Sequence, residues 1–140
     1  IHRTYLAIVS GKLTESGTID LPIGRKSESV IERCVDKTHG ERAVTHYEVL
    51  EARTDQTLVK CQLETGRTHQ IRVHMQAIGH PLVGDFLYNP HALREERPLL
   101  HSWRLAFTHP VSGDDVYFTA PVPADMQGWK WFQPDKMKVT

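Results

Sequence analysis

The chain has 140 residues, of which 39% are hydrophobic and 24% are charged, and these values predict one folded domain over residues 1–140. Seventeen basic residues balance seventeen acidic ones, so a surface for nucleic acid would have to be a local patch. No apolar run approaches the length of a membrane-spanning helix, and we expect no membrane association. Two Cys residues and no signal peptide favour a reducing, cytoplasmic location.

The first 65 residues are typical of a β-meander. Pro22 and Gly24 mark a turn after the second strand, and a polar loop around Gly40 follows the third. The last two strand-like segments alternate in polarity and are separated by the tight turn Asp55–Gln56, which predicts a β-hairpin. The predicted strands lie within residues 4–12, 13–26, 30–36, 43–53 and 57–65.

After residue 64 the apolar spacing changes to that of a helix, because large apolar side chains recur at Ile71, Met75 and Ile78. Thr68 is a candidate N-cap, and Gly79 followed by proline predicts the end. One short helix is therefore expected here.

Two further strands are predicted within residues 97–107 and 114–122, with a helical turn over residues 123–132. Trp129, Trp131 and Phe132 are expected to join the core. The pattern predicts an α+β fold with a mainly antiparallel sheet and few short helices.

The His residues near the predicted helix do not have the spacing of a metal site. His69 and His74 are five residues apart and so fall on different helix faces, whereas a zinc pair needs a spacing of four. His80 lies beyond the Gly stop. We therefore expect no metal.

The polar side of the predicted helix has an unusual composition. His69, Arg72, Val73 and Gln76 share it, and the run GRTHQIR contains no Glu, Asp or Lys. A solvated face is one interpretation. An anion such as phosphate near Arg67 and the helix N-terminus is the other, and the residues leave both open.

Several segments together resemble one family, the RluA family of pseudouridine synthases, in order and approximate spacing up to about Pro123. The stretch GRTHQIRVHM followed by GHPLVGD is the most specific. The other segments are RTYLAIVSGK, SGTIDLPIGRK, AVTHYEVLE and LLHSWRLAFTHPVSGDDVYFTAPVP.

The resemblance implies a bent, largely antiparallel sheet and isomerisation of uridine to pseudouridine in ribosomal or transfer RNA, with no cofactor. In that family an Asp in a His-Arg-Leu-Asp run attacks a uridine flipped out of the RNA. Tyr5 matches a Tyr that stacks on the base and helps to remove the C5 proton, and Arg72 matches an Arg that pairs with that Asp. RNA contacts are expected from Arg67, His69, Gln70 and Ile71.

The chain departs from the family because no His-Arg-Leu-Asp run is present; in the family this run precedes the segment of Tyr5. We therefore expect residues 1–140 to be the C-terminal part of a catalytic domain, inactive alone. Arg72 would then find another anion, water or a neighbouring chain, or its surroundings would loosen, because an unpaired buried charge is costly. Asp85 is expected to be a turn or capping residue.

Two alternatives stay open. One is a non-catalytic RNA-binding module that holds structured RNA through Arg25, Lys26, Arg67 and Arg104. The other is a structural remnant without RNA affinity, which the zero net charge favours slightly. The oligomeric state is not predicted, although an exposed sheet edge would invite pairing.

Overall fold

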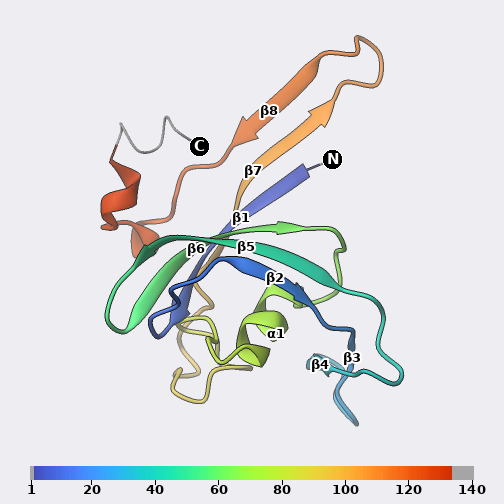
Figure 1. The fold of residues 1–140 in the computed structure, drawn as a ribbon, viewed down its shortest axis with the longest axis vertical. Helices are drawn as coiled ribbons and strands as arrows, with labels where there is room; N and C mark the ends of the chain where they lie inside the picture. Colours follow the sequence, from blue (N-terminus) through green and yellow to red (C-terminus); the bar gives the residue numbers. More distant parts are fainter. Residues whose placement is uncertain (1, 134–140) are drawn as a thin grey trace.

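The computed structural model describes residues 2–133, and its main feature is one antiparallel sheet of six strands in the order β2-β5-β6-β1-β7-β8 (Figure 1). A separate two-stranded sheet pairs β3 with β4. The predicted α+β class is confirmed. The strands are β1 (His2–Ser10), β2 (Gly17–Asp20), β3 (Ile23–Arg25), β4 (Arg33–Val35), β5 (Val44–Ala52), β6 (Gln56–Leu63), β7 (Leu100–Thr108) and β8 (Asp115–Thr119).

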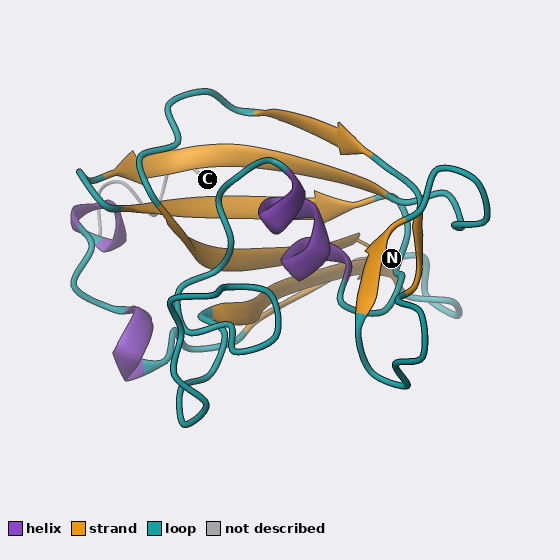
Figure 2. Ribbon diagram, turned by 90° about the horizontal axis from the view of Figure 1, so that it is seen from below, coloured by secondary structure: helices purple, strands orange, loops and turns teal. Residues whose placement is uncertain are grey.

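Strand β1 lies inside the sheet between β6 and β7, and both of its faces are buried. Successive side chains of a strand point to opposite faces. Ala7 and Val9 therefore face one core with the helix α1 (Gln70–Ala77), while Leu6 and Ile8 face a second core. Figure 2 shows α1 lying across one face of the sheet.

The second core contains the tryptophans of the C-terminal segment, as predicted. Trp129 and Trp131 are buried and pack with Trp103 of β7, whose ring makes an edge-to-face contact with that of Trp131. Two 3₁₀ turns, η1 (Ala124–Met126) and η2 (Lys130–Phe132), replace the single helical turn expected there.

The start of α1 differs from the prediction, because Thr68 is not the N-cap. His69 occupies that position in a left-handed conformation with φ 57°, and no side chain caps the helix. The C-terminal end is as predicted. Gly79 has φ 87°, its N–H donates to the carbonyl of Gln76, and the N–H of His80 donates to that of Met75, which is the Schellman pattern.

Val73 also differs from the prediction, which placed it on the polar side of the helix. It is fully buried in a third, small core with Ile23 of β3, Ala43 and Tyr88. This core attaches the β3–β4 sheet to α1, so the apolar surface of the helix is wider than the i, i+4, i+7 pattern indicated.

Candidate functional site

The loop that follows α1 turns a carboxylate toward the helix. Gly84 has φ 80°, and a Cβ at this position would lie 2.1 Å from the carbonyl oxygen of Arg97, so only glycine fits. The next residue, Asp85, is fully buried, and its Oδ1 accepts the N–H groups of Leu87 and Tyr88, each at 3.2 Å. The expected turn role of Asp85 is confirmed, and its buried carboxylate still needs a positive charge.

Arg72 supplies that charge. Its Nε donates to Oδ2 of Asp85 at 2.9 Å and its Nη2 donates to Oδ1 at 2.8 Å, which is a bidentate pair. The Arg72 side chain is 14% exposed, whereas that of Asp85 is not exposed at all. The prediction that Arg72 finds another anion is thus confirmed, and the anion comes from the chain itself.

Aromatic rings surround this pair. The guanidinium of Arg72 lies 5.2 Å from the ring centroid of Tyr88 and 5.9 Å from that of Phe86, which is half exposed. The Tyr88 hydroxyl accepts the N–H of Arg33 at 2.9 Å and lies 2.7 Å from Nδ1 of His69. Tyr88 therefore joins β4, α1 and the loop after α1.

Burial determines the protonation of both polar rings. It lowers the pKa of His69, and the charges of Arg72 and Arg33 lower it further, while Asp85 opposes them. Burial likewise raises the pKa of Tyr88. Near neutral pH His69 is uncharged and Tyr88 keeps its proton.

Gln70, a predicted RNA contact, lies in the interior instead. Its Nε2 donates to the carbonyl of Val44 and to Oγ1 of Thr45, and its Oε1 accepts from Thr65 and from the N–H of Arg67. Only 3% of the residue is exposed. The side chain holds the turn before α1 against β5, and it is not available for an RNA contact in this structure.

The remaining predicted residues lie around α1 without forming one cluster. Ile71 is buried in the core between helix and sheet, and Tyr5 packs at the margin of that same core. Arg67 is partly exposed, donates from Nε to the carbonyl of Arg42 and forms an ion pair with Glu41 at 2.7 Å. Tyr5 and Arg72 make no hydrogen bond with each other, because the described hydrogen bonds of the Arg72 side chain both go to Asp85.

His74, which the sequence suggested only as a metal ligand to be rejected, is a fully buried polar residue. Its Nε2 donates to the carbonyl of Leu21 at 2.8 Å, so its Nδ1 accepts from the hydroxyl of Thr45. Burial lowers the pKa of His74. The partner residues are distant in the sequence, and no local pattern could have revealed them.

The His residues near α1 point to separate partners, with His80 bonded to the carbonyl of Ser10. In the part of the chain that the structure describes, no group of three His, Cys, Asp or Glu side chains could hold a metal ion. None of its helices is long and apolar enough to cross a membrane.

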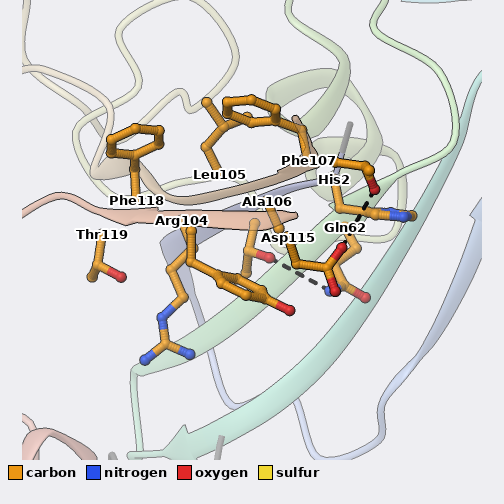
Figure 3. Close-up of a pocket in the computed structure, with 12 residues that line it drawn as sticks. His2, Gln62, Arg104, Leu105, Ala106, Phe107, Asp115, Phe118 and Thr119 are labelled. Carbon is orange, nitrogen blue, oxygen red and sulfur yellow. Dashed lines mark hydrogen bonds between the residues drawn. The ribbon is translucent and has the colours of Figure 1, made fainter. Parts of the chain in front are cut away.

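Two surface grooves contain arginines that were predicted to contact RNA. The larger, of about 700 Å³, runs along the β7–β8 hairpin (Figure 3). Arg104 and Gln62 lie on one side of this hairpin and Leu105 and Phe118 on the other. The smaller, of about 430 Å³, lies between the β3–β4 sheet and the turn that precedes α1. Arg104, a predicted RNA contact, lines the first groove, and Arg25 and Arg67 line the second.

The fold is that of a pseudouridylate synthase domain. The human protein "RNA Pseudouridylate Synthase Domain Containing 1" superimposes with a TM-score of 0.71 at 32% identity, over 96% of this chain and 57% of that one. The sequence model of the family "RNA pseudouridylate synthase" matches residues 1–77. The chain therefore belongs to this family, as the motif around Arg72 indicated.

Two bacterial relatives support the same family assignment. The chain is 50% identical over 127 residues to the "Uncharacterized RNA pseudouridine synthase YjbO" of Bacillus subtilis, and 46% identical over 135 residues to the "Ribosomal large subunit pseudouridine synthase D" of Nitrosomonas europaea. Each alignment covers 90% of this chain, but 44% of the first relative and 39% of the second. The chain thus spans less than half the length of these relatives.

Proposed function

We propose that the polypeptide carrying this chain isomerises uridine to pseudouridine in structured RNA. The observation that carries the proposal is the orientation of Arg72. Asp85 occupies Nε and Nη2, and among the described residues none hydrogen-bonds to Nη1. The guanidinium is partly exposed, and Asp85 binds the edge formed by Nε and Nη2. The other edge, which carries Nη1, can therefore bind a second carboxylate.

In this proposal the second carboxylate is the nucleophilic Asp that the family carries in its His-Arg-Leu-Asp run. Arg72 would keep that carboxylate ionised and directed at the sugar, because a neighbouring positive charge favours the charged form. Asp85 prevents Arg72 from turning toward solvent. Tyr5, at the margin of the core that contains Ile71, would stack on the uracil.

We further propose ribosomal RNA as the substrate and the cytoplasm as the location. The name of the Nitrosomonas europaea relative, which refers to the large ribosomal subunit, supports the first. The free thiols of Cys34 and Cys61 are compatible with a reducing compartment.

Tritium release from RNA labelled at C5 of uridine tests the function in the full-length polypeptide. Arg72→Lys should abolish release, since a point charge does not reproduce the planar fork. Arg97→Lys is the matched control, because Arg97 makes a bidentate pair with Asp125 at the surface. RNA affinity that persists without any tritium release from the unsubstituted polypeptide would favour a non-catalytic RNA-binding module.

A further inference from the structure

The β3–β4 sheet places two like charges opposite each other. Arg25 and Arg33 are register partners at the end of this short sheet, an arrangement that destabilises a strand pair. The neighbouring residues Lys26 and Glu32, by contrast, carry opposite charges and form a salt bridge at 3.1 Å. No carboxylate among the described residues forms an ion pair with Arg25 or Arg33.

The two arginines are held differently. Nη1 of Arg33 donates to the carbonyl groups of Val30, Ile31 and Glu32, at 3.3, 2.9 and 3.2 Å, which orients the guanidinium without neutralising it. The side chain of Arg25 is exposed and makes no hydrogen bond or ion pair with a described residue. A guanidinium that is held by carbonyl groups, beside one without a protein partner among the described residues, is an arrangement that an anion can bridge.

Both arginines line the smaller groove, which Arg67 completes from the turn before α1. Three guanidinium groups and one carboxylate, that of Glu41, line it, so its formal charge is 3 − 1 = +2 with His39 neutral. The whole chain has a formal net charge of zero. This groove is therefore a local cationic site in a molecule that provides no general cationic field.

The carboxylate that lines the groove and two carboxylates near it in the sequence are already engaged. Glu41 pairs with Arg67 at 2.7 Å, and Glu32 pairs with Lys26. Asp36 accepts the N–H groups of Thr38 and His39, and those hydrogen bonds hold its pKa below the ordinary value. None of them is directed at Arg25.

We propose that this groove binds a phosphodiester group of the substrate RNA, bridged between Arg25 and Arg33; the identity of that RNA rests on the proposed function. Tyr88 ties the groove to the candidate catalytic residues, since its hydroxyl accepts the N–H of Arg33 and lies 2.7 Å from His69, while its ring lies beside Arg72. A phosphate held here would position the RNA strand relative to Arg72, because Tyr88 contacts residues of both sites.

The test compares Arg25→Gln with Arg94→Gln in the full-length polypeptide. Arg94 is an exposed arginine outside the groove that makes no hydrogen bond with a described residue. The probe is a uridine-containing stem-loop RNA, and its affinity is measured over a range of salt concentrations. Arg25→Gln should weaken binding about tenfold. It should also reduce the slope of log affinity against log salt by about 0.7 to 0.9.

A second measurement separates binding from folding. Because Arg25→Gln removes a like-charge pair, its melting temperature in phosphate-free buffer should equal or exceed that of the parent. Arg25→Lys should keep the salt slope but lose part of the affinity, since only the fork is removed.

Equal RNA affinities for Arg25→Gln and Arg94→Gln would overturn the inference, and so would a parent polypeptide without RNA affinity. Stabilisation by inorganic phosphate that requires Arg25, with RNA affinity independent of Arg25, would also overturn it in favour of a free-phosphate site. An Arg25-dependent affinity in a polypeptide that releases no tritium would support the phosphodiester site and refute the proposed isomerisation.

Discussion

Replacing Arg72 by Ala tests whether the buried ion pair with Asp85 is a structural requirement. The substitution removes two charge-assisted hydrogen bonds, at 2.8 and 2.9 Å, each worth about 1.5 to 3 kcal/mol. It leaves a fully buried carboxylate with only the N–H groups of Leu87 and Tyr88. The expected loss in free energy of unfolding is about 3 to 5 kcal/mol, as for other buried pairs that lose one partner.

The control is Arg97→Ala, because Arg97 and Asp125 form an equally short bidentate pair, at 2.6 and 2.8 Å. Their side chains are 46% and 48% exposed, so solvent screens the pair and its loss should cost at most about 1 kcal/mol. Urea denaturation of both variants, with m-values compared, measures the difference. Equal losses would refute the argument that burial rather than geometry decides the contribution of the pair.

Four further outcomes are expected. Burial lowers the pKa of His74 below 6.5, so the unfolded chain binds more protons than the folded chain below that pH. The contribution of His74 to stability should be full above pH 6.5 and should be lost as the pH falls through the lowered pKa. In melting curves, His74→Gln should flatten this pH dependence. Gly84→Ala should destabilise the fold more than Gly79→Ala, since both glycines have positive φ but only Gly84 faces a backbone oxygen; equal melting temperatures would contradict this. Nitrogen chemical shifts should show His69 as the neutral tautomer with the proton on Nε2, because the Tyr88 hydroxyl already accepts the N–H of Arg33 and can donate its own proton to Nδ1. The 140-residue chain alone should release no tritium from labelled RNA, and any release would contradict the expectation that residues 1–140 are inactive alone.

The strands and the end of the helix were predictable because their signals are local. Alternating polarity marks the β5–β6 hairpin, and Gly79 marks the end of α1. The start of the helix was not predictable from Thr68, since Gln70 secures the preceding turn through partners on β5. Contacts between residues so far apart in the sequence produce no periodic pattern from which they could be predicted.

The same contrast between local signals and long-range contacts explains which features of the site could be predicted. The need of Arg72 for an anion follows from its chemistry, and the structure meets that need with Asp85. The sequence contains a sign of this, because a glycine directly before an acidic residue favours a tight turn. It does not show that the turn folds back onto α1, which depends on the approach of Gly84 to Arg97.

The polar side chains of α1 therefore have partners on different sides of the helix. These partners explain why the run GRTHQIR contains no acidic residue. Gln70 and His74 bond inward to Thr45, while Arg72 turns toward the loop and Asp85. An acidic side chain on the helix would compete with Asp85 for Arg72 and would repel the RNA phosphate proposed beside Arg33. His69 is half-buried with Nδ1 beside the Tyr88 hydroxyl, so Nε2 is the ring nitrogen that it can offer to the proposed RNA.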